Sequence, residues 1–95
     1  MFVLIGKMDL FIPESQSLKD KRMVIKSISE KLKYKYKVSL AETGENHKWQ
    51  RAEISLAAVS KEQTYLEVLE NRIKYFILDN YPVELLEWDF EIIKK

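Results

Sequence analysis

Hydrophobic and polar side chains alternate from Phe2 to Ile12, at the beginning of the chain. An alternation with a period of two is typical of a β-strand, because successive side chains of a strand point to opposite faces. Pro13 follows directly and ends the predicted strand. One face carries Phe2, Leu4, Gly6, Met8, Leu10 and Ile12, and the other carries Val3, Ile5, Lys7, Asp9 and Phe11.

The spacing changes to that of a helix after the linker at residues 13–16. Ser17 is a natural N-cap with Asp20 three residues later, and a helix can run from there to about Tyr36. Its apolar stripe consists of Leu18, Ile25, Ile28 and Leu32, with Val24 at the margin.

Two further strands and their connection follow. Val38–Thr43 resembles a short strand, and Ala52–Ser60 alternates as a longer one. The polar residues 44–49 between them predict a hairpin loop. In the longer strand, Ala52, Ile54, Leu56 and Ala58 lie on one face, and Glu53, Ser55, Ala57 and Val59 lie on the other.

A second helix and a last strand complete the pattern. Ser60 can cap this helix, which runs to about Asp79 before Asn80-Tyr81-Pro82 breaks it. Its apolar positions at helical spacing are Leu66, Leu69, Ile73, Phe76 and Ile77. The last strand carries Leu86, Trp88, Phe90 and Ile92 on one side, and Leu85, Glu87, Asp89 and Glu91 on the other.

The element order is that of the α+β class. Strand, helix, strand, strand, helix, strand (β-α-β-β-α-β) predicts a ferredoxin-like sandwich, a four-stranded antiparallel sheet with two helices on one face. We expect residues 1–95 to form a single ferredoxin-like domain, because 95 residues with 46% hydrophobic side chains can bury one core. Right-handed crossovers then place the first and third strands in the centre of the sheet.

The amino-acid composition excludes several kinds of catalytic and metal-binding site. The chain has no cysteine and one histidine, His47, which excludes disulfides, thiolate catalysis and a histidine metal cluster. It lacks a nucleophile paired with a base, and its two glycines cannot form a glycine-rich phosphate loop. We therefore expect a protein that is not an enzyme and has no cofactor and no metal site. The apolar start of the chain is also too short to cross a membrane, so we expect no membrane partner.

Charge is distributed unevenly although the net charge is only +1. Residues 17–37 contain eight basic and two acidic side chains, whereas residues 62–91 contain two basic and eight acidic ones. A basic helix face can lie along a phosphate backbone with an affinity that falls steeply with salt. It can equally be a solvated face, or meet the acidic face of a second copy. The stripe consists of Lys19, Arg22, Lys26, Glu30, Lys33 and Lys37.

Chain reversal at each element predicts that residues 15–22, 45–51 and 80–82 meet at one end of the sheet. An anion can dock there between Ser15, Ser17 and the backbone of Lys19, because a helix start supplies N–H donors. Alternatively, Ser17 only caps the helix.

Two residues at this end have alternative explanations. Lys21 falls within the apolar arc of the first helix. Its aliphatic side chain can extend past the helix end and bring the ammonium to solvent. Alternatively, the ammonium can pair with Glu42 or Glu45, or it can contact a ligand. Trp49 can stack on a base or ligand ring, or it can anchor the hairpin or an oligomer contact.

The predicted open face of the sheet has one aromatic residue, Phe11, on its two central strands. RNA-recognition domains of this topology stack bases on aromatic side chains at that place, so we do not expect base stacking on the sheet itself. The half-apolar face suits a second copy of the chain or another protein.

Several segments resemble the YlxP-like family of small bacterial proteins of unknown function. They are Ile12-Pro13, Ser17-Leu18-Lys19-Asp20-Lys21-Arg22, Val38-Ser39-Leu40-Ala41-Glu42 and Trp49-Gln50-Arg51-Ala52. The chain departs from the family at Asn46-His47-Lys48, where an acidic residue is usual before the tryptophan. The resemblance implies a ferredoxin-like fold, a cytoplasmic location and a gene near translation and ribosome-maturation factors, and it implies no catalytic residues.

These observations favour a non-enzymatic binding module that contacts structured RNA or a ribonucleoprotein in translation or ribosome maturation. Trp49 would stack on bases and Arg51 would make bidentate contacts. The alternative is a homo-oligomeric ferredoxin-like module that associates through the open sheet face and binds a small anionic ligand at the end of the sheet. The expected binding residues are Ser17, Lys19, Lys21, Arg22, Lys26, Lys33, Trp49 and Arg51.

Overall fold

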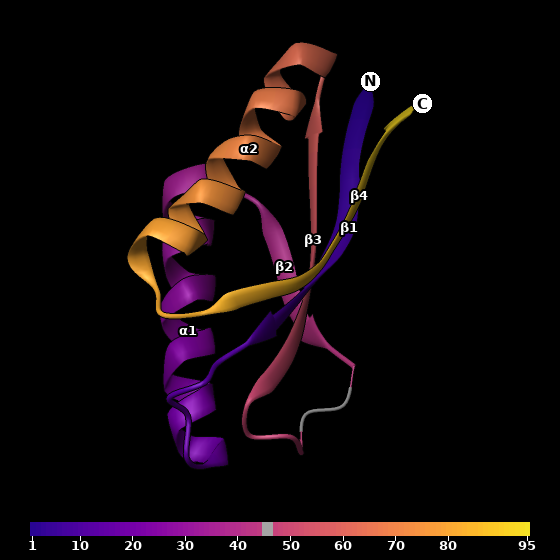
Figure 1. Cartoon of the computed structure of the whole chain (residues 1–95). Helices are drawn as coiled ribbons and strands as arrows, with labels where there is room; N and C mark the ends of the chain where they lie inside the picture. Colours follow the sequence, from indigo (N-terminus) through magenta and orange to yellow (C-terminus); the bar gives the residue numbers. More distant parts are fainter. Residues whose placement is uncertain (45–46) are drawn as a thin grey trace.

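The structure is a computed structural model that describes residues 1–44 and 47–95 (Figure 1). Its elements follow the predicted order and confirm the ferredoxin-like α+β fold. They are β1 (Phe2–Phe11), α1 (Leu18–Tyr36), β2 (Ser39–Thr43), β3 (Arg51–Ser60), α2 (Gln63–Asn80) and β4 (Glu84–Lys94).

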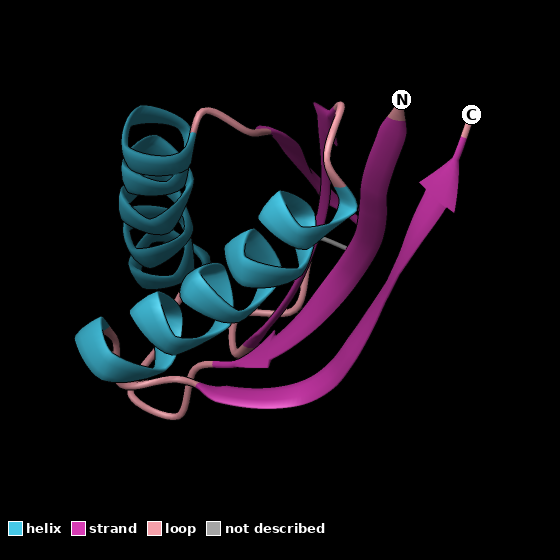
Figure 2. Cartoon of the chain, turned by 90° about the horizontal axis from the view of Figure 1, so that it is seen from above, coloured by secondary structure: helices cyan, strands magenta, loops and turns pink. Residues whose placement is uncertain are grey.

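The four strands form one antiparallel sheet in the order β2-β3-β1-β4. The first and third strands are therefore central, as predicted. Figure 2 shows that α1 and α2 both lie on the same face of the sheet. We call the other face, which neither helix covers, the open face.

The core fills the space between the two helices and the covered face of the sheet. The alternation in β1 and β3 decides which side chains enter it, and the predicted inner faces of both strands are confirmed. The helices contribute the apolar positions at helical spacing. The fully buried apolar side chains include Leu4, Met8, Leu10, Ile28, Leu32, Ile54, Leu66, Ile73 and Ile77.

The helix ends differ in how well the sequence predicts them. Ser17 is the N-cap of α1, as predicted, and its hydroxyl accepts the Asp20 N–H at 3.1 Å. The prediction that Ser60 caps α2 is wrong, because Ser60 is still the last residue of β3 and the N-cap is Glu62. The Ser60 hydroxyl accepts the Glu62 N–H at 3.1 Å and so shapes the turn before the helix.

The face assignment of β4 holds for most of the strand and fails at its start. A β-bulge shifts the register, so that Asp9 pairs with Glu87 but Leu10 pairs with Leu85. The extra residue, Leu86, is 50% exposed, whereas Leu85 packs against the core. The prediction that Leu86 shares the inner face with Trp88 is therefore wrong, because one inserted residue reverses the alternation.

Gly6 in the middle of β1 makes room for an aromatic side chain of β4. A Cβ atom at position 6 would lie 2.6 Å from a ring carbon of Phe90 and would also overlap the Asp89 carbonyl oxygen. The Phe90 ring in turn lies beside the Trp88 ring, with 4.4 Å between their centroids. Trp88 also donates its indole N–H to Glu70 of α2 at 2.9 Å, which ties β4 to the helix layer.

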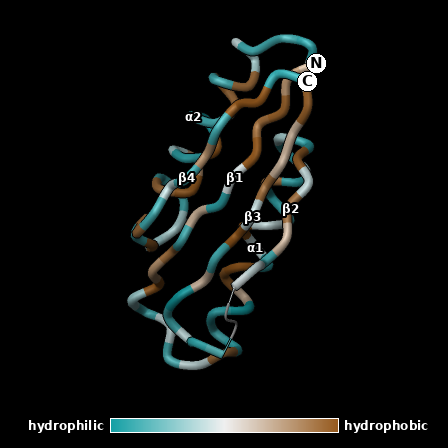
Figure 3. Tube along the Cα trace, turned by 90° about the vertical axis from the view of Figure 1, so that its right-hand side faces the viewer, coloured by the Kyte–Doolittle hydropathy of each residue, from teal (hydrophilic) through white to brown (hydrophobic). Residues whose placement is uncertain are grey.

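The open face is more apolar toward the chain ends and more polar toward the β2–β3 connection, and Figure 3 looks onto this face. Near the chain ends, Ile5, Val59 and Ile93 are exposed on it. Toward the β2–β3 connection it carries charged side chains. On the open side of the sheet these are Lys7, Asp9, Arg51, Glu53, Glu87 and Asp89, whereas Glu91 lies beside Ile5, nearer the chain ends.

Candidate nucleic-acid interface

The outward face of α1 carries a row of exposed cations. Ile25, Ile28 and Leu32 bury the opposite side of the helix, so helical periodicity directs the row toward solvent. Glu30 is the acidic residue in the row and lies 4.0 Å from the Lys26 ammonium, with both side chains mostly exposed. The cations expected here are all exposed: Lys19, Arg22, Lys26 and Lys33.

The beginning of α1 uses its polar groups within the chain. The Ser17 hydroxyl accepts the Asp20 N–H, and the Asp20 carboxylate accepts the Gln16 N–H at 3.0 Å. Ser15 is 3% exposed and donates its hydroxyl to the Ser17 carbonyl oxygen. Ser17 thus acts as a helix cap, and an acidic side chain stands where the anion was expected.

Lys21 lies inside the molecule, among the apolar positions of α1. Its side chain is 1% exposed, and its ammonium donates to the Arg51 carbonyl oxygen at 3.3 Å. It also pairs with Glu42 at 3.6 Å, which is one of the two partners expected from the sequence; the other, Glu45, lies outside the described residues. Lys21 therefore joins α1 to β2 and β3 and does not present its charge to solvent.

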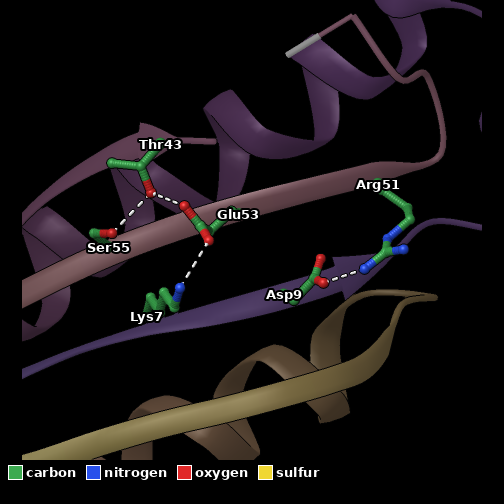
Figure 4. A network of polar contacts seen from close by, with 6 residues as sticks. All are labelled: Lys7, Asp9, Thr43, Arg51, Glu53 and Ser55. Carbon is green, nitrogen blue, oxygen red and sulfur yellow. Dashed lines mark hydrogen bonds and ion pairs between the residues drawn. The ribbon is translucent and has the colours of Figure 1, made fainter. Parts of the chain in front are cut away.

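Arg51 lies on the open face, where its guanidinium group forms an ion pair with Asp9 of the neighbouring strand (Figure 4). About half of its side chain remains exposed. The pairing offsets much of its charge and fixes its direction along the sheet.

A polar network next to this pair was not found from the sequence. The Thr43 hydroxyl donates to Glu53 at 2.6 Å and is also hydrogen-bonded to Ser55 at 2.8 Å, while Lys7 pairs with Glu53 at 3.4 Å (Figure 4). The Thr43 hydrogen bond, aided by Lys7, lowers the pKa of Glu53 below its ordinary value of 4.5. Strand alternation places these residues on one face, but only the β2–β3 register shows that they touch.

Trp49 and Phe11 line the same hollow at the end of the sheet. The hollow has a volume of about 410 Å³, and His47, Lys48, Gln50 and Arg51 complete its lining. Trp49 is 53% exposed. The sequence gives no signal that the two aromatic residues meet, since Phe11 belongs to a strand and Trp49 to the hairpin connection.

Only two of the three segments expected to converge do so. The Ile12 N–H donates to the Gln50 carbonyl oxygen at 2.7 Å, which joins the β1–α1 linker to the start of β3. The turn at Tyr81 instead lies beside the middle of α1, where the Tyr81 and Ser27 hydroxyls are 2.8 Å apart (Figure 1). Ser27 is ten residues beyond Ser17, about 15 Å along the helix, so the expectation that residues 80–82 join the others is wrong.

Within residues 1–44 and 47–95, no three histidine or acidic side chains are grouped so as to hold a metal ion.

No helix in these two ranges is both long enough and apolar enough to traverse a lipid bilayer.

The comparisons with known proteins agree with the resemblance seen in the sequence. The chain is 36% identical over 74 residues to the "Uncharacterized protein YlxP" of Bacillus subtilis (strain 168), which covers 78% of this chain and 79% of that protein. The model of the family described as "Protein of unknown function (DUF503)" matches residues 3–90. The chain therefore belongs to this family of proteins of unknown function, to which the YlxP-like resemblance pointed.

Proposed function

We propose that this protein is a non-enzymatic binding module that contacts structured RNA through the outward face of α1. The observation that carries the proposal is the row of exposed cations formed by Lys19, Arg22, Lys26 and Lys33. Side chains of this kind supply the sequence-independent part of nucleic-acid binding by replacing counterions along the phosphate backbone.

The length of the row favours a polyanion over a small anion. Lys19 and Lys33 are fourteen residues apart, which is about 21 Å along a helix. Two exposed charges separated by more than the Debye length, about 8 Å at physiological salt, are largely screened from each other. A small anion would therefore meet one or two cations, whereas a nucleic-acid strand that follows the helix meets all of them.

The acidic residues determine which side of the molecule meets the RNA. Residues 62–91, which contain α2 and most of β4, have a net charge of −6 from two basic and eight acidic side chains. The β4 side chains Glu87, Asp89 and Glu91 lie on the open face. These surfaces repel phosphate, so that the molecule presents α1 to the RNA.

Replacing three cations of the row by alanine tests the proposal. The Lys19→Ala/Arg22→Ala/Lys26→Ala variant is titrated against ribosomal RNA fragments, chosen because the family resemblance implies genes near translation and ribosome-maturation factors. The matched control is Lys61→Ala/Lys94→Ala/Lys95→Ala, which removes the same charge from exposed residues elsewhere.

The expected result is a loss of affinity that is specific to α1. The α1 variant should reduce the slope of log affinity against log salt by about three, one per phosphate contact, while the control changes it much less. The proposal is wrong if the protein does not bind RNA at low salt, or if both variants weaken binding equally.

Self-association through the apolar half of the open face is a second candidate, which the exposure of Ile5, Val59 and Ile93 favours. The open face carries more carboxylates than cations, and two such faces repel each other, so we rank it below RNA binding. Light scattering on the wild-type protein and on Ile5→Lys tests it. A dimer that the substitution dissociates supports this candidate, and a monomeric wild-type protein excludes it.

A further inference from the structure

The hollow lined by Phe11 and Trp49 can bind a ligand by aromatic stacking, which the cations of the basic helix cannot do. We infer that it receives one unpaired nucleobase of the bound RNA, stacked on the Trp49 ring. This inference rests on the proposed function and deepens it, because a base site makes single-stranded or bulged nucleotides, and not a continuous duplex, the preferred form of RNA.

The aromatic lining has the chemistry that an unpaired base requires. Trp49 leaves 53% of its surface in water, and Phe11 contributes a second ring to the same lining. Stacking of a base on an aromatic side chain contributes about 1–3 kcal/mol and tolerates any sequence, since every base has a π-face.

The charges around the hollow fit a nucleotide. Lys48 and Arg51 contribute positive charge to the described lining, and this lining contains no carboxylate. The Arg51 guanidinium forms an ion pair with Asp9, which holds its side chain at one side of the hollow. It therefore contributes less to phosphate binding than an arginine without an acidic partner would. The phosphates of the strand therefore depend mainly on the cations of α1.

Three hydrogen bonds hold the hollow close to the beginning of the basic row. The Gln50 backbone carbonyl accepts from Ile12, and the Gln50 side-chain amide donates to the Pro13 carbonyl oxygen at 3.2 Å. Lys21, in the first turns of α1, donates to the carbonyl oxygen of Arg51. These bonds join β3, the β1–α1 linker and α1, so an RNA strand that stacks a base on Trp49 passes around this end of the sheet to meet Lys19.

The test compares a blunt RNA duplex with the same duplex carrying a single-stranded overhang. Wild-type protein should bind the overhang RNA more tightly. Trp49→Leu should lose about 5- to 150-fold in affinity for the overhang RNA, which is the range of one base stack, and nothing for the blunt duplex. Trp49→Phe is the matched control and should retain most of the affinity, because it keeps an aromatic ring.

An overhang in which abasic sites replace the nucleotides removes the bases but keeps the phosphates. Wild-type affinity should fall to that of Trp49→Leu, and Trp49→Leu should bind the abasic and normal overhangs equally. The inference is overturned if the abasic overhang binds wild-type protein as tightly as the normal one, or if Trp49→Leu weakens both RNAs equally.

These outcomes are separable from failure of the proposed function. If only the base site is wrong, the α1 triple variant still loses affinity for both RNAs. That result would support RNA binding by the basic helix and reject stacking on Trp49. If neither RNA binds wild-type protein, both proposals fail together. The abasic RNA needs no protein variant, so the test holds even if a substitution at Trp49 disturbs folding.

Discussion

Two lysine–glutamate pairs of similar length lie on opposite sides of the sheet. Lys21 and Glu42 are 3.6 Å apart under α1, and Lys7 and Glu53 are 3.4 Å apart on the open face. The two glutamates are equally exposed, at 28%, but the lysines are 1% and 48% exposed. The pairs thus differ mainly in how far the cation has been removed from water.

The burial of a lysine, more than the identity of its partner, decides what its charge can do. A desolvated ammonium needs every hydrogen bond that it can make, because an unpaired charge in the interior is costly. A half-exposed one exchanges its partner for water at little cost. Lys21 is therefore a structural residue within a basic helix, and the exposed cations beside it are the ones available for binding.

The largest expected effect follows from shortening Lys21. Lys21→Ala removes three methylenes and the ammonium from the interior, and it should lower the free energy of unfolding by about 2–3 kcal/mol. Lys21→Met keeps the stem and should cost less than about 1 kcal/mol, because Glu42 can regain water. Urea unfolding of both variants measures this. Equal losses would show that the charge, and not the packing, makes Lys21 necessary.

A smaller effect is expected at the exposed pair. Lys7→Met should change the free energy of unfolding by less than about 1 kcal/mol, and the change should shrink at high salt, as for other surface pairs. Unfolding at low and high salt measures it, with Lys21→Met as the buried counterpart. The contrast breaks down if the Lys7 substitution costs as much as Lys21→Ala, or if its effect does not respond to salt.

The smallest effect is a pH dependence at Glu53. Its pKa is lowered in the folded state, chiefly by the Thr43 hydroxyl. The ionised carboxylate therefore stabilises the fold above the ordinary pKa of 4.5, and this stabilisation is lost as the pH falls through the lowered value. Thr43→Val should be less stable than wild type at neutral pH, and part of the difference should disappear in acid.

Ser55→Ala is the matched control for that measurement. It removes the hydrogen bond between Ser55 and Thr43 and leaves the bond to Glu53 intact. Its effect on stability should not depend on pH between neutral and acid conditions. Chemical denaturation at both pH values compares the variants, and a pH-independent difference for Thr43→Val contradicts the assignment.

The sequence predicts those parts of the fold that depend on local pattern. Alternation identifies the inner face of β1, and a cap followed by helical spacing identifies α1 from Leu18 to Tyr36. Both signals arise within a few residues of chain, so they need no knowledge of the neighbouring elements. The exposure of Lys19, Arg22, Lys26 and Lys33 follows from the same helical period.

Features that depend on pairing between distant segments could not be predicted. The bulge that exposes Leu86 exists because β4 pairs with β1, and the network around Glu53 depends on the β2–β3 register. The hollow likewise requires Phe11 and Trp49 to meet across a strand end and a hairpin. Alternation assigns each residue to a face of the sheet, but it does not predict which residues of neighbouring strands pair or how deeply a side chain is buried.

The glycine at position 6 sets how closely β1 and β4 approach each other. A methyl group there would overlap the Asp89 carbonyl oxygen and the Phe90 Cα as well as the Phe90 ring. A smaller side chain at position 90 removes only the ring contact, because the other two atoms belong to the backbone. Gly6→Ala should therefore not be rescued by a substitution at position 90, and any side chain at position 6 would require the two strands to move apart.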